Sequence, residues 1–149
     1  MDIEKPRQEI SSAISPKEKY RSSPQEGILE SRDFEREGKL LGGSIGDARF
    51  VKIMDYGGGV FKPHSRYEGK QKAEFIARER AAYLISRFLG FDFVPPTVIK
   101  IVDRKEGSLQ EFVEDAQVGW EVKNEDVLDE VMLKLTIFDN LIDNMDRHG

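Results

Sequence analysis

One long helical segment, residues 71–89, stands between two groups of short strand-like segments and constrains the fold more than any other feature. The segment is dense in helix formers, and Gly90 directly after it is a typical C-terminal stop. Four segments around it are recognised as strands by their β-branched and large apolar residues: 48–54, 60–62, 97–102 and 108–113. The order predicts an α+β fold in which an antiparallel sheet carries one long helix.

Composition narrows the class of protein. A length of 149 residues suits about one domain, and the net charge of −5 argues against a nucleic-acid partner, which needs a basic surface. The chain has no cysteine, which excludes disulfides and cysteine-based metal sites, and two histidines, too few for a histidine-based metal site. No apolar run approaches the ~20 residues of a membrane span, and the charged N-terminus does not resemble a signal peptide. We expect a cytoplasmic protein without a transmembrane segment.

Residues 1–37 differ in composition from the rest. They are rich in Glu, Lys, Arg, Ser and Pro, and their three prolines interrupt any helical period. Such a segment has too few apolar residues to offset the entropy of ordering it. The sequence therefore predicts a flexible polar tail over 1–37, or alternatively a partner-docking arm, and a folded domain over 38–149.

Two glycine-rich turns bracket the first strand. Residues 42–46 read Gly-Gly-Ser-Ile-Gly, and residues 55–59 form a second turn cluster. Glycines allow the backbone N–H groups of a turn to approach an anion such as phosphate. The pattern of 42–46 leaves a plain hairpin turn open as the alternative.

Lys62 lies in the apolar segment 60–62 and is followed at once by Pro63, which ends the strand. A lysine in this position either faces solvent or contacts phosphate as a point charge, in which case a carboxylate must hold it. Glu79 is the candidate, because apolar neighbours three and four residues away place it at the edge of the buried stripe of 71–89. Periodicity leaves open a surface glutamate paired with a neighbouring cation: Lys72, Arg78 or Arg80.

The last part of the chain predicts a second helix over residues 125–143 with Asn124 as its N-cap. Its apolar stripe has helical spacing and is expected to be core: Leu128, Val131, Leu135, Phe138 and Ile142. The helix leads into a polar loop, 144–149, that carries Asp146. A carboxylate presented in a loop at the end of a buried helix is well placed to act as a general base.

Three acidic residues, Asp139, Asp143 and Asp146, gather near the end of this helix. Acids at a helix C-terminus are unfavourable, so the cluster favours either a metal ion or a nearby cation such as Arg147. For Asp139 and Asp143, ordinary solvated acids remain the alternative.

Four motifs in this order resemble the protein-kinase-like superfamily, in its atypical branch of phosphatidylinositol 3-/4-kinase-like and Fam20-type (Golgi casein kinase-like) proteins. They lie at residues 60–63, 79–96, 107–113 and 137–148. The first resembles the strand that holds the ATP lysine, and the second the helix that carries its ion-pair glutamate. The third resembles the strand entering the interlobe hinge, and the fourth the catalytic helix and loop. The resemblance implies an N-lobe, an antiparallel sheet with one long helix, followed by the first C-lobe helix and the catalytic loop.

The resemblance also implies ATP-dependent transfer of the γ-phosphoryl group to a hydroxyl acceptor, with Mg²⁺ or Mn²⁺ as the metal. Lys62, Glu79 and Asp146 take the catalytic roles: Lys62 holds phosphates, Glu79 orients Lys62, and Asp146 accepts or orients the acceptor hydroxyl. The nucleotide-binding residues are Gly42, Gly43, Ser44, Lys62 and the main chain of Glu111, Phe112 and Val113. The residues that brace the catalytic loop are Asn144, Arg147 and His148.

The family's metal-binding residues follow the catalytic loop and have no counterpart in residues 1–149. We therefore expect the chain to be an N-terminal fragment of a longer kinase, truncated at the catalytic loop and without turnover by itself. The alternative is a non-catalytic, pseudokinase-like module that binds a nucleotide or a partner. A third reading treats the motifs as coincidence in a small α+β domain, in which Lys62 and Glu79 have no reason to meet.

Overall fold

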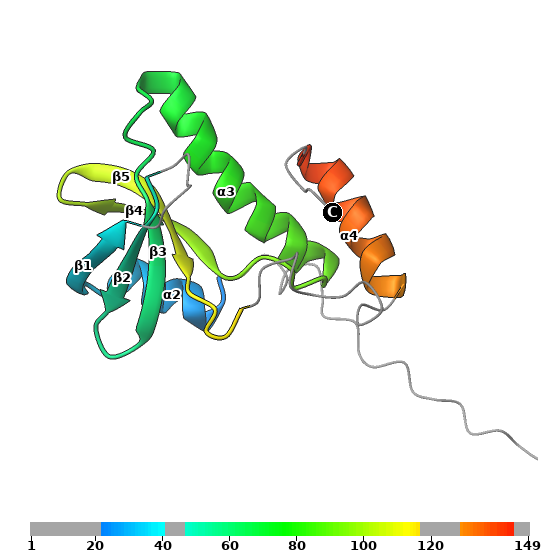
Figure 1. Cartoon of the computed structure of the whole chain (residues 1–149), viewed down its shortest axis with the longest axis horizontal. Coiled ribbons are helices and arrows are strands. Elements are labelled where there is room, and N and C mark those ends of the chain that lie inside the picture. Colours follow the sequence, from blue (N-terminus) through cyan, green and yellow to red (C-terminus); the bar gives the residue numbers. More distant parts are fainter. Residues whose placement is uncertain (1–21, 41–46, 117–128, 145–149) are drawn as a thin grey trace, which may run out of the picture.

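The computed structural model of the chain describes residues 22–40, 47–116 and 129–144 (Figure 1). Within these ranges the structure is α+β, as predicted, and combines one five-stranded sheet with three helices. The strands are β1 (Phe34–Leu40), β2 (Arg49–Ile53), β3 (Gly57–Lys62), β4 (Thr97–Val102) and β5 (Lys105–Glu111). The helices are α2 (Pro24–Ser31), α3 (Gly69–Leu89) and α4 (Asp129–Ile142).

The sheet is antiparallel throughout and has the strand order β1-β2-β3-β5-β4. The last of these five strands in sequence, β5, therefore lies between β3 and β4, with Phe61 opposite Leu109 and Lys62 opposite Ser108. Because side chains alternate along a strand, Phe61 and Leu109 face one side of the sheet and Lys62 faces the other. The first of these sides holds the main apolar core: Leu29, Val51, Ile53, Phe61, Val98 and Leu109.

Helix α2 occupies part of the segment predicted to be a tail. Ser23 caps it: the Ser23 hydroxyl accepts the Glu26 N–H, and the Glu26 carboxylate accepts the Ser23 N–H. Leu29 is fully buried in the core, and β1 continues from the helix into the sheet. The structure thus differs from the predicted tail over residues 22–37, because tertiary burial rather than local composition orders them. Residues 1–21 lie outside the described ranges.

Lys100 of β4 closes the C-terminal end of α2. Its ammonium group donates to the carbonyl oxygens of Leu29, Glu30 and Arg32 at 2.9, 3.1 and 2.5 Å. The last carbonyls of a helix have no intrahelical partner, so a lysine from a neighbouring strand satisfies them. This contact fastens α2 to the sheet at one end.

The glycines of the second predicted turn belong largely to strand β3, and the turn itself lies earlier, at 54–56. A Cβ atom on Gly59 would stand 2.9 Å from the Leu109 side chain. One on Gly58 would stand 2.7 Å from the Phe50 ring. Because these glycines have no side chain, the Leu109 and Phe50 side chains can pack against the backbone of β3. A run of glycines that is typical of a turn therefore forms a strand here.

Helix α3 spans the predicted segment and ends as predicted at Gly90, which adopts the left-handed conformation with φ 67°. Its buried residues are Ile76, Tyr83 and Ser86. The Ser86 hydroxyl accepts the backbone N–H groups of Phe93 and Val94 and so anchors the turn that leads into β4.

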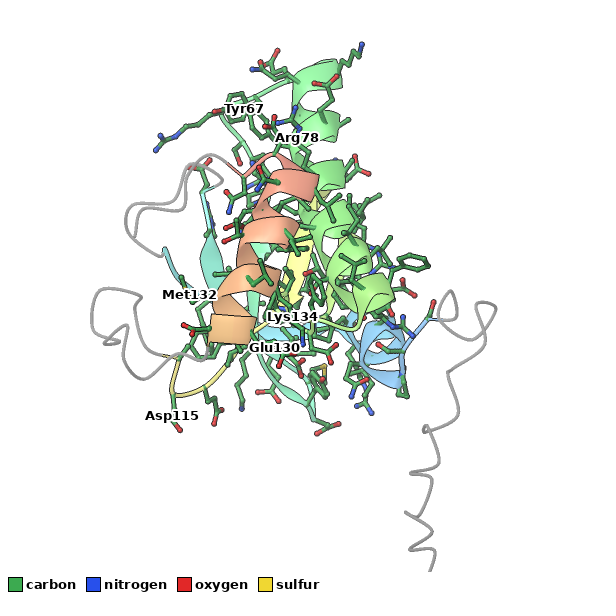
Figure 2. All side chains as sticks on the ribbon, turned by 90° about the vertical axis from the view of Figure 1, so that its right-hand side faces the viewer. Tyr67, Arg78, Asp115, Glu130, Met132 and Lys134 are labelled. Carbon is green, nitrogen blue, oxygen red and sulfur yellow. The ribbon has the colours of Figure 1, made fainter. Side chains whose placement is uncertain are left out.

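Helix α4 lies beyond α3 as seen from the sheet (Figure 1). Phe138 is its buried residue and meets Phe93 edge to face, with ring centroids 6.0 Å apart. The described members of the predicted stripe are buried or half-buried, whereas Leu133, Ile137 and Leu141 on the opposite side are exposed. Figure 2 places Glu130, Met132 and Lys134 on this helix, nearest the viewer. None of the described helices has the length and apolar character needed to cross a membrane.

Candidate functional site

An ion pair joins β3 to α3 at the centre of the predicted site. The Lys62 ammonium donates to both carboxylate oxygens of Glu79, at 3.0 and 2.9 Å. Both side chains are about three-quarters buried, with 23% and 26% of their surface exposed. The predicted meeting of Lys62 and Glu79 is confirmed, and the alternative pairing of Glu79 with a neighbouring cation on its own helix does not occur. Arg80, one of those neighbours, instead binds Glu26.

The sheet positions Lys62 through a close contact between strands. Gly107 of β5 lies against β3, and a Cβ atom at Gly107 would stand 2.6 Å from the Lys62 carbonyl oxygen. A side chain at Gly107 would therefore push the two strands apart. Pro63 ends β3 directly after the lysine, so the chain turns away once Lys62 has reached α3.

His64 is a buried residue at this site that none of the sequence motifs includes. It is 4% exposed, and its Nε2 atom lies 4.0 Å from Glu79 Oε1. Its ring stacks on Phe75, with centroids 5.6 Å apart. Burial lowers the pKa of His64 below its ordinary value; Glu79 opposes this shift, while Lys62 and Lys72 reinforce it. His64 is therefore neutral at pH 7. It does not compete with Lys62 for an ion pair with Glu79.

Several buried polar atoms beside the ion pair lack a partner. In the part of the chain that the structure describes, the two ring nitrogens of His64 have no hydrogen-bond partner. The Ser108 hydroxyl has none there either. Ser108 stands opposite Lys62 in the ladder between β3 and β5. Buried polar groups are normally hydrogen-bonded, and these atoms are almost wholly inaccessible to solvent, so they mark an enclosed polar region beside the ion pair. His64 directly follows Lys62 and Pro63, and this place in the sequence is a signal that it lies near the site. Its burial depends on tertiary contacts and cannot be predicted from its neighbours in the sequence.

The end of β5 carries the residues predicted to contact adenine. The Glu111 N–H donates to the Pro96 carbonyl at 2.8 Å, and the Phe112 N–H donates to the Gly58 carbonyl at 3.0 Å. These two N–H groups are thus engaged within the protein and cannot bind a base. Val113, half exposed, is the member of the predicted set whose N–H has no backbone partner within the described ranges.

Tyr56 fixes this strand end from the side. Its hydroxyl donates to Glu111 Oε1 at 2.5 Å. Burial, followed by this hydrogen bond, raises the pKa of Tyr56 to about 12. The turn before β3 and the end of β5 are therefore held together by a charge-assisted hydrogen bond.

Many predicted site residues lie outside the described ranges, and their roles stay predictions: Gly42, Gly43, Ser44, Asp146, Arg147 and His148. Asn144 is described. Its backbone N–H donates to the Asp139 carbonyl at 2.9 Å and its side-chain amide to Asp139 Oδ1 at 3.1 Å. Asn144 thus closes the end of α4 directly before the predicted loop. Within the described residues, no three Asp, Glu, His or Cys side chains gather into a possible metal site.

Comparison with known proteins gave no relative: no family model, no curated protein and no solved structure matches the chain.

Proposed function

We propose that this chain is the nucleotide-binding part of a protein-kinase-like phosphotransferase, which transfers the γ-phosphoryl group of ATP to a hydroxyl acceptor. The observation that carries the proposal is the bidentate ion pair between Lys62, at the end of the third strand, and Glu79, on the helix that follows. Protein kinases hold ATP with a lysine of their third strand and orient that lysine with a glutamate of the next helix.

The chemistry of the pair supports a phosphate-binding role. A lysine ammonium has three N–H donors on a flexible stem, and two of them bind Glu79. The third remains for an oxygen of a phosphate group, at a position that the carboxylate fixes. Partial burial strengthens the attraction between the lysine and an incoming anion, because water screens it less.

Nucleotide binding would draw on Lys62 and on the backbone that follows β5. Val113 offers a backbone N–H for adenine. Mg²⁺ or Mn²⁺, when bound with the nucleotide, would neutralise charge on the phosphates. Within the described residues no three Asp, Glu, His or Cys side chains gather into a possible metal site, and Asp146, the proposed partner of the acceptor hydroxyl, lies outside the described ranges.

The test is a calorimetric titration of the chain with ATP in the presence of Mg²⁺. Lys62→Ala is expected to weaken binding by about tenfold or more, the cost of losing a charged hydrogen bond. Lys52→Ala is the matched control, since Lys52 is a strand lysine that pairs with a glutamate, Glu35, away from the site. Circular dichroism checks that both variants fold. Failure of the unaltered chain to bind ATP, or equal weakening by both substitutions, would refute the proposal.

Transfer is measured separately, with radiolabelled ATP and with Asp146→Asn as the second variant. Turnover that Asp146→Asn abolishes supports the kinase. ATP binding that depends on Lys62, without turnover in the unaltered chain, is expected both for a truncated kinase and for the non-catalytic module, so it supports nucleotide binding without deciding between the two.

A further inference from the structure

Glu26 is a buried carboxylate that takes no part in the Lys62–Glu79 ion pair. It is 1% exposed, although it lies in the first turn of the short helix α2. Its Oε1 atom accepts Arg80 Nη2 at 2.5 Å. Its Oε2 atom accepts Arg87 Nη1 at 2.6 Å, the Tyr83 hydroxyl at 3.1 Å and the Ser23 N–H at 2.7 Å.

These contacts explain how a carboxylate can remain charged inside the protein. Burial alone raises the pKa of Glu26, but the hydrogen bonds from Ser23 and Arg80 outweigh it and hold the pKa below its ordinary value. The charge is therefore present at neutral pH, where it binds two arginines of α3. A buried carboxylate with two guanidinium partners fixes geometry, because both the distance and the angle of each bond are demanding.

The three α3 residues that bind Glu26 determine how that helix is rotated. Arg80, Tyr83 and Arg87 are spaced at three and four residues, so they share one face of α3 across successive turns. The Arg80 guanidinium also donates to the Thr97 carbonyl of β4. Together these bonds hold one face of α3 against α2 and the sheet edge.

Glu79 directly precedes Arg80, so the rotation that fixes Arg80 also directs Glu79. Side-chain tips lie roughly 6 Å from a helix axis, and a turn of about 20° moves them by roughly 2 Å. The bonds from Lys62 to Glu79 are 3.0 and 2.9 Å long, and a displacement of that size would break both.

We propose that Glu26 is a positioning residue for the Lys62–Glu79 ion pair: α2 holds α3 in the rotation at which Glu79 meets Lys62. The Glu26–Arg80–Arg87 cluster is thus the point at which the segment before the sheet controls the site. The consequence for nucleotide binding rests on the proposed function, whereas the control of the ion pair itself does not.

The experiment follows the Lys62 ammonium by ¹⁵N NMR, since an ammonium held in an ion pair gives a signal at neutral pH that a freely solvated one loses through exchange. Lys62→Arg assigns that signal. Glu26→Gln keeps the shape of the side chain and removes its charge, and it is expected to abolish the signal. Val51→Ala is the matched control: Val51 is fully buried in β2 within the apolar core, so its truncation destabilises the fold without removing a hydrogen bond or ion pair of Glu26.

Each outcome decides the proposal. Loss of the signal in Glu26→Gln and its retention in Val51→Ala supports it. Retention in a folded Glu26→Gln variant, or loss in both variants, overturns it. If Glu26→Gln does not fold, Tyr83→Phe and Arg87→Met each remove one donor to Glu26, and a signal unaffected by both overturns the proposal in the same way.

A second titration separates this proposal from the proposed function. If the unaltered chain binds ATP, Glu26→Gln is expected to weaken that binding by about 5- to 150-fold, the usual range for coupling between distant groups. If the unaltered chain binds no ATP while Glu26→Gln still abolishes the ammonium signal, the positioning role stands and the nucleotide role fails.

Discussion

Gly107→Ala is the substitution whose cost can be worked most directly from the structure. The new Cβ atom would stand 2.6 Å from the Lys62 carbonyl oxygen and 2.7 Å from a carbon of the Phe61 ring. Ordinary contact begins at 3.4 Å, so the first distance falls about 0.8 Å short. The oxygen belongs to the backbone of a central strand and cannot rotate away. Overpacking of this kind typically costs about 1–3 kcal/mol, and we expect the upper end.

Thermal and urea unfolding measure this cost. A loss of about 3 kcal/mol corresponds to a fall in Tm of roughly 6–12 °C for a chain of this size. The control is Gly27→Ala, because Gly27 lies in helix α2 and an added Cβ there meets nothing within 4 Å. Alanine favours a helix over glycine by about 1 kcal/mol, so this variant should gain stability. A Gly107→Ala protein within about 0.5 kcal/mol of the unaltered chain would refute the reasoning.

Three further substitutions test other contacts. Lys100→Met should lower the free energy of unfolding by about 1–3 kcal/mol in urea, since it leaves the last carbonyls of α2 unpaired; an unchanged midpoint would contradict this. His64→Phe should change the pH dependence of stability. The folded pKa of His64 lies below its unfolded value, so its neutral form stabilises the fold fully above about pH 6.5 and that contribution is lost as the pH falls through the folded pKa. Between about pH 7.5 and pH 5, the free energy of unfolding should therefore fall more steeply for the unaltered chain than for His64→Phe. An equal pH dependence in the two proteins would contradict the burial of a neutral imidazole. An absorbance titration of the unaltered chain should show a phenol with a pKa of about 12, and Tyr56→Phe should remove that ionisation. If the ionisation persists in the variant, it belongs to another tyrosine.

Local pattern was enough to predict the elements whose stability depends on local sequence. Helix α3 is dense in helix formers and ends at Gly90, and β4 is a run of β-branched residues, so both were placed within a few residues. The glycines of β3 show where this reasoning fails. In isolation, Gly58 and Gly59 are typical of a turn. In the sheet, neighbouring side chains occupy the space that a Cβ atom at either position would need, so only glycine fits there.

Helix α2 carries a clear local signal at its start. Ser23 and Glu26 stand three residues apart with Pro24 between them, the pattern of a capping box with proline in the first turn. The surrounding charges and prolines are typical of a flexible tail. Tertiary contacts decide the outcome, because Leu29 enters the core and Glu26 binds arginines more than fifty residues away.

At the candidate site, periodicity alone left Glu79 undecided between a surface position and the edge of the core. The order of motifs favoured its meeting with Lys62, and the structure shows that meeting. The burial of His64 was beyond prediction, since it depends on a ring from the following helix, Phe75, stacking on it. Adjacent residues do not determine such contacts.

The buried Glu26 also sets where the chain can be cut. A fragment that begins at residue 38, where composition placed the start of the domain, would expose Arg80 and Arg87 as an unmatched pair of cations and open the core where Leu29 belongs. Trypsin, which cleaves after lysine and arginine, should therefore spare Arg32 in the folded chain, because it follows directly on α2 and its N–H is bound to the helix. We therefore expect the shortest fragment that folds to include the cap at Ser23.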